Sequence, residues 1–271
     1  MSNGFFTDAT LCIGCKACEV ACKQWNQLPA DGFKWTGQSY DNTAELSATT
    51  WRHVAFVERA RPADGTGKQV DWLMMSDVCK HCTHAGCLEA CPTGAIIRNE
   101  FGDVFVQPDI CNGCGYCIPS CPFGVIGRNQ DTGLASKCTL CYDRQKDGIE
   151  PACAKACPTD SILFGDVDEL KERAKKRVET LHERGETAAY LYGVDEDTSV
   201  GDLNAFFLLT DRPAAYNLPE NPQLPQENIL SGFVASLIAA VFLTLATMFS
   251  LREKKTAMGR GTMMERERIV R

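Results

Sequence analysis

The 271-residue sequence lacks the net positive charge that is typical of nucleic-acid-binding proteins, and it lacks an N-terminal segment that resembles an export signal. Its net charge is −7, whereas a nucleic-acid footprint needs a basic face, so no nucleic-acid partner is expected. The opening residues, MSNGFFTDAT, hold no basic start, no apolar run and no twin arginine. We therefore do not expect them to be an export signal.

Sixteen cysteines stand out in an otherwise ordinary composition, with 44% hydrophobic and 23% charged residues. Disulfides would be the simplest interpretation for an exported protein. The spacing argues against them, because four cysteines lie between residues 12 and 22 and the others are nearly as crowded. Such crowding leaves little room for disulfide geometry and favours ligation of compact metal centres.

The cysteines form four groups of four, called groups one to four in chain order. Their members are Cys12, Cys15, Cys18 and Cys22; Cys79, Cys82, Cys87 and Cys91; Cys111, Cys114, Cys117 and Cys121; and Cys138, Cys141, Cys153 and Cys157. Group three matches the Cys-x2-Cys-x2-Cys-x3-Cys-Pro run of two-cluster ferredoxins, whose fourth cysteine ligates the neighbouring cluster. Group one has Lys23 in place of the proline, and groups two and four each lengthen one spacer.

Zinc is the main alternative metal, but zinc ligands usually come as two separated pairs rather than as packed triplets with a trailing Cys-Pro. With four cysteines to each cluster, no iron is left open for substrate. The sequence therefore predicts four 4Fe–4S clusters that pass single electrons, and no catalytic residue. His81 and His84 lie inside group two and are expected to tune or cover a cluster. Lys80, Lys137 and Arg144 lie beside ligands and either balance the cluster charge or are solvated.

The last three groups share a repeat, in which the fourth cysteine is followed by proline, a turn and a short apolar segment. The apolar segment predicts a strand. The proline should end the short helix that carries the cysteine and turn the chain back. Because two half-motifs make one two-cluster domain, four of them predict two ferredoxin-like units in an α+β fold.

Three stretches outside the motifs have patterns of their own. Residues 23–78 hold all four tryptophans, whose expected role is mostly core packing, and a strand-like run at 53–57. Residues 166–185 predict an amphipathic surface helix with an acidic capping box at its start and a glycine at its end. Residues 211–228 are rich in Pro, Asn and Gln and predict an extended connector.

One long run, Ile229 to Leu251, contains no charged residue. As a helix it would be roughly 34 Å long, enough to cross a bilayer core of about 30 Å. A buried core helix is the soluble alternative, but such helices rarely run this far without a polar face. The sequence therefore predicts a transmembrane helix at 229–251, in contact with lipid.

The flanks of this helix predict its orientation. The tail at 252–271 carries seven Lys or Arg, whereas the eighteen residues before the helix carry one, Arg212. The positive-inside rule puts the tail in the cytoplasm and the cluster domain in the periplasm or another extracytoplasmic space. Without an export signal of its own, the folded chain would have to cross with a partner that carries a twin-arginine signal.

The whole pattern resembles a family, the four-cluster iron–sulfur subunits of the molybdopterin (dimethyl sulfoxide reductase) oxidoreductases. The likeness is greatest to the beta subunits of membrane-bound formate dehydrogenases. It is carried by residues 12–22, 35–43, 51–58, 190–194 and 203–207, and by the apolar C-terminal helix. Nitrate reductase partners replace one group-four cysteine with tryptophan, whereas this chain keeps Cys153, which argues against that branch.

The resemblance implies which cysteines share a cluster, in four sets that we name A to D. Set A is Cys12, Cys15, Cys18 and Cys157; set B is Cys138, Cys141, Cys153 and Cys22; set C is Cys79, Cys82, Cys87 and Cys121; set D is Cys111, Cys114, Cys117 and Cys91. Groups one and four then form an outer unit within residues 1–165. Groups two and three form a second unit, at about 75–127, inserted in the first. A surface helix and connector at 166–228 would link these interleaved units to the transmembrane helix.

The resemblance also implies a function. The clusters would form a wire from a molybdenum or tungsten subunit that oxidises formate to a membrane cytochrome b subunit that reduces quinone. The alternative keeps the wire but changes the catalytic partner, for example to a sulfur-compound reductase, in which electrons flow the other way. A membrane-anchored zinc module that only binds partners and a cluster-based redox sensor are further alternatives.

Overall fold

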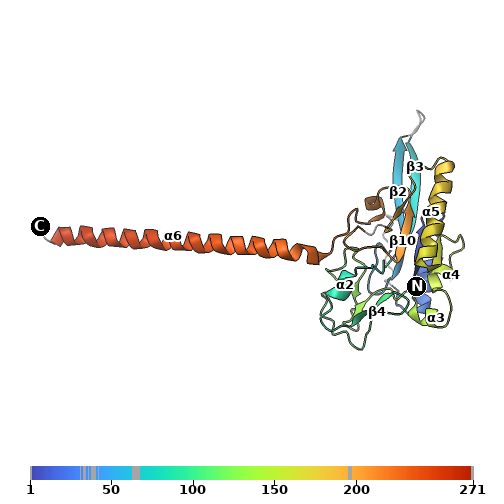
Figure 1. Cartoon of the computed structure of the whole chain (residues 1–271), viewed down its shortest axis with the longest axis horizontal. Helices are drawn as coiled ribbons and strands as arrows, with labels where there is room; N and C mark the ends of the chain where they lie inside the picture. The colour runs from blue at the N-terminus through green and yellow to red at the C-terminus, as the bar shows by residue number, and fades with distance from the viewer. Residues whose placement is uncertain are drawn as a thin grey trace. The chain divides into compact units, whose positions relative to one another are not determined.

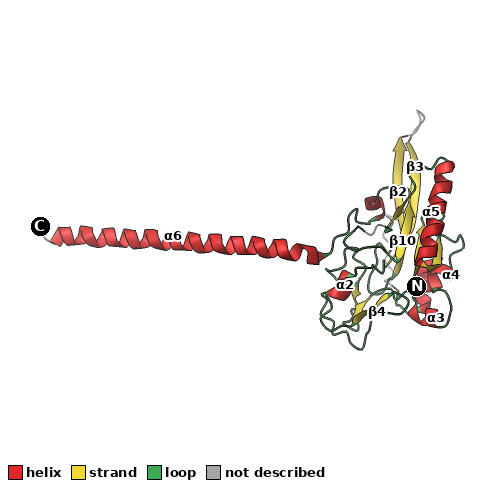
Figure 2. Ribbon diagram, viewed as in Figure 1, coloured by secondary structure: helices red, strands yellow, loops and turns green. Residues whose placement is uncertain are grey.

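The structure is a computed structural model that divides into two units, Met1–Leu224 and Pro225–Arg271. It describes residues 2–30, 32, 35, 37, 41, 43–62, 68–194 and 197–269. Much of the 35–43 stretch that contributes to the resemblance, and residues 270 and 271 of the basic tail, lie outside the described residues. The first unit combines short strands and helices with long loops (Figures 1 and 2).

The elements follow the chain in a mixed order. They are β1 (Asn3–Asp8), α1 (Ala17–Trp25), β2 (Arg52–Pro62), β3 (Lys68–Val78), α2 (Gly86–Glu89), β4 (Ile96–Arg98), β5 (Val104–Val106), β6 (Gly127–Arg128), β7 (Ala135–Ser136), α3 (Tyr142–Lys146), α4 (Ala152–Lys155), β8 (Ile162–Asp166), α5 (Val167–Glu183), β9 (Tyr190–Tyr192), β10 (Ala205–Leu209), the 3-10 helices η1 (Pro213–Tyr216) and η2 (Pro225–Asn228), and α6 (Ile229–Ile269).

A four-stranded sheet in the order β8-β1-β10-β9 organises the first unit. Strand β1 runs antiparallel to β8 and parallel to β10. Every residue of β10 is buried, because the apolar run Ala-Phe-Phe-Leu-Leu is covered on both faces of the sheet. The pairing of β1 with β8 brings the residues before group one beside those after group four, with Thr7 opposite Ile162.

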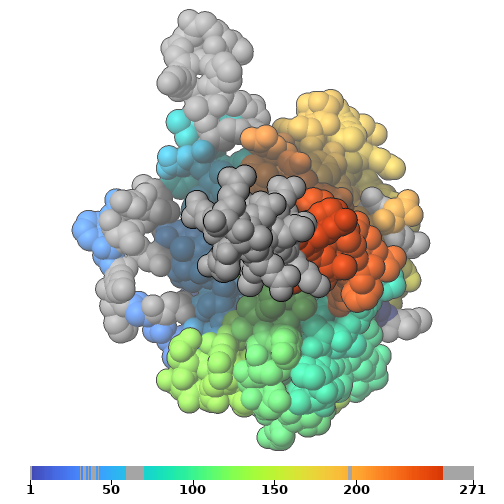
Figure 3. All heavy atoms as spheres, turned by 90° about the vertical axis from the view of Figure 1, so that its left-hand side faces the viewer, coloured from blue at the N-terminus to red at the C-terminus, as the bar shows by residue number. Residues whose placement is uncertain are grey.

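In the part of the chain that the structure describes, three hairpins lie outside this sheet: β2–β3, β4–β5 and β6–β7. The strands predicted after each Cys-Pro are present as β4, β6 and β8, and the predicted 53–57 strand lies within β2. In the space-filling view, the residues of the middle of the chain, coloured teal to yellow-green, form one continuous part of the visible surface (Figure 3).

The prolines set the lengths of the short helices, as the repeat predicts. Helices α2 and α4 end two residues before Cys91 and Cys157, each of which precedes a proline. Helix α1 instead continues past Cys22 to Trp25, because Lys23 leaves a backbone N–H in place and does not clash with the preceding turn.

The predicted surface helix is present as α5. The carboxylate of Asp166 accepts hydrogen bonds from the backbone N–H groups of Asp168 and Glu169, at 3.0 and 3.3 Å, and so caps the helix. Leu170 and Ala174 are buried on its inner face. Gly185, with φ of 93°, follows the end of the helix in a left-handed conformation that glycine adopts at low cost.

Two predictions about the remaining stretches were wrong. Trp25, Trp35 and Trp72 are exposed and only Trp51 packs against the core, because an indole can satisfy its N–H at the surface, as Trp25 does on Asp143. The 211–228 stretch is not simply extended, since it contains η1 and η2. Its apolar residues, among them Tyr216, Leu218 and Leu224, are buried in the core of the first unit.

The second unit is dominated by α6. Residues Pro225–Arg252 form one helical stretch long and apolar enough to cross a membrane, and the predicted span at 229–251 lies within it. Its hydroxyls bond within the helix: Ser236 and Thr247 donate to the carbonyls of Gly232 and Leu243, at 2.8 and 3.0 Å. Such internal pairing lets polar side chains enter an apolar environment.

Candidate iron–sulfur centres

All sixteen cysteines lie within the described residues, and each is a free thiol. They belong to the first unit, mostly on loops and short helices at the ends of the strands. Cys79 follows directly after β3, for example, and Cys153 lies in α4. The crowding noted in the sequence is therefore not relieved by disulfides.

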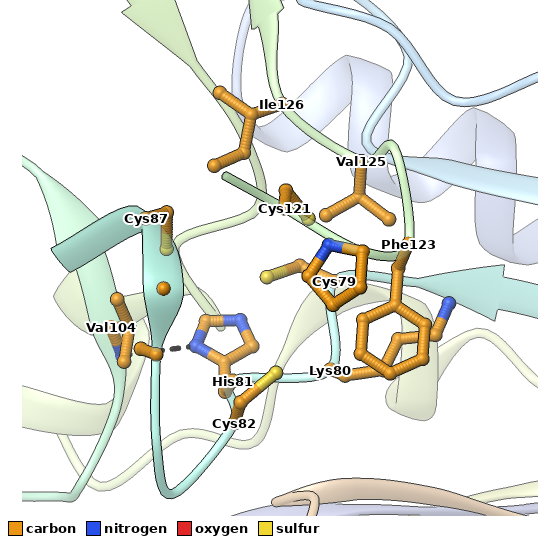
Figure 4. A pocket seen from close by; sticks show the side chains of 13 residues that line it. Cys79, Lys80, His81, Cys82, Cys87, Val104, Cys121, Phe123, Val125 and Ile126 are labelled. Atoms are coloured by element: carbon orange, nitrogen blue, oxygen red, sulfur yellow. Dashed lines mark hydrogen bonds between the residues drawn. The ribbon is translucent and has the colours of Figure 1, made fainter. Parts of the chain in front are cut away.

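The four members of set C line one cavity, together with apolar side chains such as Val104 and Ile126. Figure 4 shows Cys79, Cys82, Cys87 and Cys121 around this space, together with His81. Cys79, Cys82 and Cys87 come from the loop after β3 and the adjoining helix α2, whereas Cys121 comes from the Cys-Pro turn before β6, so two separate segments must pack together to form the cavity.

The four members of set A line a second cavity. Cys12 and Cys15 lie on the loop between β1 and α1. Gly14 in that loop has φ of 67°, and a Cβ there would come within 2.6 Å of Phe56 and Met74. Glycine is therefore needed for the β2–β3 hairpin to cover this cavity closely.

In sets B and D, cysteines of the same set shift each other's pKa values. Burial raises the pKa of the Cys22 thiol, and Cys153 and Cys141 raise it further. Burial raises the pKa of Cys117 to about 11, and the other three cysteines of set D, at positions 111, 114 and 91, add to the shift. The cysteines of set D, and those of set B through Cys138, therefore lie near enough for their charges to interact.

Neighbouring sets also affect each other, although burial is the largest cause of each pKa shift. At three places, a cysteine of one set raises the pKa of a cysteine in the next set. The pairs are Cys18 with Cys153, Cys138 with Cys79, and Cys87 with Cys117. The sets therefore follow one another in the order A, B, C, D, with exposed cysteines, Cys15 and Cys114, in the two end sets.

Arg52 is a functional candidate that the cysteine motifs did not reveal. It is 1% exposed, and its Nη2 lies 3.3 Å from Sγ of Cys153. Its Nη1 donates to the carbonyl and hydroxyl of Ser76, and its guanidinium stacks on Phe5. The only sequence signal was a charged residue directly before the mostly apolar run at 53–57, because an arginine that is buried needs a partner.

The three cations beside ligands are buried rather than solvated. Lys137 lies 3.4 Å from Sγ of Cys79 and also donates to the carbonyl of Cys138, at 2.9 Å. Lys80 bonds instead to Asp77 and to the carbonyl of Val78. Arg144 stacks on a tryptophan ring and donates to a carbonyl. Of the three, Lys137 is the one that the structure records on a cysteine sulfur.

His81 is buried beside the set C cavity. The backbone N–H of Val104 donates to its Nδ1, at 3.1 Å, and its Nε2 has no hydrogen-bond partner among the described residues. Burial, with Lys137 and Arg98 nearby, holds the pKa of His81 well below its usual value. Because Nδ1 accepts the N–H of Val104, this nitrogen carries no proton.

The donor chemistry fits 4Fe–4S clusters. Burial holds the pKa of Cys138 and Cys82 well above the usual value, so a metal centre is needed to stabilise their thiolates. Buried Arg52 and Lys137 then gain anionic partners. Among the described residues, no three or more His, Cys, Asp or Glu converge on a single metal ion. Cysteines that surround a space rather than a point suit a cluster better than zinc.

Two family profiles, both described as a 4Fe–4S dicluster domain, match residues 11–95 and 70–167. The formate dehydrogenase iron–sulfur subunit of Haemophilus influenzae is 42% identical over 238 residues, which are 86% of this chain and 74% of that protein. The formate dehydrogenase-O iron–sulfur subunit of Escherichia coli K12 is 40% identical, over 87% of this chain and 80% of that protein.

A more limited likeness extends to other complexes. The thiosulfate reductase electron transfer subunit of Salmonella typhi is 40% identical over 163 residues, which are 60% of this chain and 74% of that protein. The formate dehydrogenase relatives thus match this chain over a greater length. The chain belongs to the family of formate dehydrogenase iron–sulfur subunits and is a non-catalytic electron-transfer subunit that carries four 4Fe–4S clusters.

Proposed function

We propose that this chain conducts electrons from a molybdopterin subunit, with molybdenum or tungsten, that oxidises formate to a membrane cytochrome b subunit that reduces quinone. The observation that carries the proposal is the succession of sets A, B, C and D through one unit, with exposed Cys15 in one end set and exposed Cys114 in the other. A buried series of one-electron centres with two accessible ends suits conduction between two partners.

The ligands of the clusters are proposed to be sets A to D. Support comes from the cavities, because set C and set A each line one. In both cavities the fourth cysteine comes from a different group than the first three, as in two-cluster ferredoxins.

The units are proposed to be interleaved, with groups two and three inserted between groups one and four. The pairing of β1 with β8 supports this arrangement, since it joins the start of group one to the end of group four. The matched profiles follow the chain in order and overlap at 70–95, so they do not decide the pairing.

The direction of the wire is proposed from where the chain leaves the first unit. Leu224 donates its N–H to Ser199, and the neighbouring Val200 accepts from the N–H of His84, beside Cys82 of set C. Because the apolar span begins at Pro225, the set C and D end is proposed to face the membrane subunit. At the other end Ile13 and Val20, 59% and 67% exposed, flank set A and suit docking of the catalytic subunit.

The anchor is proposed to cross the membrane once, with the cluster domain outside and the 252–271 tail in the cytoplasm. The basic residues of the tail support this orientation. A reporter that is active only in the cytoplasm should be active when fused to the C-terminus. Activity of a periplasm-specific reporter at that position would reverse the proposed topology.

A sulfur-compound reductase remains the second candidate, with electrons flowing from quinol to the catalytic partner. The likeness to the thiosulfate reductase subunit favours it, but that likeness covers 60% of this chain, against 86% for a formate dehydrogenase relative.

Electron paramagnetic resonance on the complex, solubilised anaerobically from its native membrane, tests both candidates. Formate alone should produce reduced-cluster signals, and dithionite should then reduce the rest. If dithionite works and formate does not, the second candidate replaces the first. If neither gives a signal and the metal is zinc, the cluster function fails.

Single cysteine variants test the ligand sets. Cys121→Ala should abolish the same signal as Cys79→Ala, because both belong to set C. If each group instead held its own cluster, Cys121→Ala would match Cys111→Ala. The signals that remain in each variant report that the rest of the chain is folded.

A further inference from the structure

His81 borders the cavity of set C without being one of its thiols. Its side chain is 1% exposed, and Figure 4 shows the ring among Cys79, Cys82 and Cys87. The backbone at His81 has φ of 46°, in the left-handed region. This conformation is sparsely populated for residues other than glycine, although histidine adopts it more often than most, so the loop holds the ring at this place at some cost.

One hydrogen bond determines where the proton of the ring lies. The backbone N–H of Val104 donates to Nδ1, at 3.1 Å, so Nδ1 is an acceptor and carries no proton. A neutral imidazole then has its single proton on Nε2. A doubly protonated ring would set its own N–H against the N–H of Val104.

The Nε2–H group has no acceptor among the residues that the structure describes. A buried donor without a partner destabilises the fold, and such donors are rare in folded proteins. This nitrogen belongs to a residue that lines the set C cavity, so a group bound there would supply the missing acceptor.

We propose that the Nε2–H of His81 donates a hydrogen bond to a sulfur of the cluster held by set C and raises the reduction potential of that cluster. The proposal rests on the proposed assignment of set C. Hydrogen bonds to cluster sulfurs favour the reduced form, because that form carries one more negative charge. One electron arrives from a neighbouring cluster and no proton is transferred, since the proton stays on Nε2.

The positive charge of Lys137 also favours a higher reduction potential of the set C cluster. The ammonium of Lys137 lies 3.4 Å from Sγ of Cys79 in the same set. Set C lies between sets B and D in the succession, where the two proposed units meet. The set C cluster would therefore have a raised reduction potential. An electron that moves between the two end clusters would be held at this cluster.

Two substitutions separate the donor from the packing role of the ring. His81→Asn places an oxygen near the position of Nδ1, so it keeps the acceptor for Val104 and tolerates the left-handed backbone, but it has no donor at the position of Nε2. His81→Gln is longer and places an amide N–H near that position. His84→Asn is the matched control, because the exposed side chain of His84 lies in the same loop but does not line the set C cavity, in contrast to what its place in group two predicted.

The test is a redox titration of the holo complex followed by electron paramagnetic resonance, with Cys82→Ala used to identify the set C signal. His81→Asn should lower the midpoint potential of that signal by about 59 mV, a tenfold change in the one-electron equilibrium. His81→Gln should recover part of the shift, and His84→Asn should leave the potential unchanged. Pulsed measurements on protein with ¹⁵N-labelled histidine should show a nitrogen coupling to this cluster that His81→Asn abolishes.

Failure of the inference is distinguishable from failure of the ligand assignment. If Cys82→Ala removes one signal and His81→Asn leaves its potential and nitrogen coupling unchanged, the assignment stands and the role of His81 is overturned. If Asn and Gln lower the potential equally, the ring acts by packing and the donor role is overturned. If Cys82→Ala removes no signal, the assignment of set C fails and the inference fails with it.

Discussion

Lys137 precedes Cys138 in the chain, yet its ammonium lies 3.4 Å from Sγ of Cys79, a cysteine of a different set. The same ammonium donates to the carbonyl of Cys138, at 2.9 Å, and to that of Val104. One buried cation, 2% exposed, therefore joins the ligand loops of sets B and C. In a medium of low dielectric, its charge acts on both centres.

Lys137→Met should lower the midpoint potential of the set C cluster, because the positive charge that favours the reduced form is lost. We expect a change of about tenfold in the one-electron equilibrium, roughly 59 mV. Redox titration followed by electron paramagnetic resonance measures it. Lys137→Arg, which keeps the charge, should shift the potential less, and Lys176→Met on the exposed face of α5 should not shift it. Equal shifts in all three variants would contradict the electrostatic explanation.

Arg52→Met should make the set B cluster easier to lose. The substitution removes the donor to Cys153 and leaves the buried carbonyl of Ser76 without that bond. Hydrogen bonds to charged groups contribute about 2 kcal/mol, so iron release to a chelator should be roughly thirtyfold faster. Arg173→Met, an exposed arginine of α5, is the control. An unchanged rate in Arg52→Met would mean that the guanidinium is not needed to retain the cluster.

Asp103 should make the stability of the first unit depend on pH. Burial raises the pKa of its carboxyl from 3.8 to about 7, although Asn99 and Gln145 donate to it. The folded state then binds the proton more tightly than the unfolded state. This contribution is fully present below about pH 4 and is lost as the pH rises through about 7, on the order of 4 kcal/mol.

Thermal unfolding of the holo protein at a fixed scan rate, from pH 5 to pH 8, measures this effect. Asp103→Asn mimics the protonated carboxyl. The unfolding temperature of this variant should therefore fall less as the pH rises. Asp109→Asn, at an exposed carboxyl, should retain the wild-type slope. A slope unchanged in Asp103→Asn would exclude this carboxyl as the source.

The helical stretch Pro225–Arg252 should be the membrane anchor. A chain truncated after Leu224 should leave the membrane fraction on an alkaline carbonate wash, because it loses the apolar side chains that lipid would solvate. A chain truncated after Arg252 keeps the stretch and should remain in the membrane. If the shorter chain also remained, attachment would depend on a partner subunit rather than on this helix.

The local features were predictable because they depend on neighbouring residues. Proline after Cys91 and Cys157 ends a helix within a few residues, and Asp166 caps α5 through backbone groups two and three positions away. The exposed tryptophans were predicted wrongly, because hydrophobicity alone does not say whether a side chain with a polar N–H is covered.

The sequence by itself determined the number and spacing of the thiols, the strands that follow the Cys-Pro turns, helix α5 and the apolar run at 229–251, because each follows from chain-local geometry or composition. Only the tertiary structure decided that Arg52 and Lys137 are buried against Cys153 and Cys79, 101 and 58 residues away. It also decided that the Nε2 of His81 has no acceptor among the residues that the structure describes. Those contacts depend on how distant segments pack, and burial then strengthens each interaction by removing water from it.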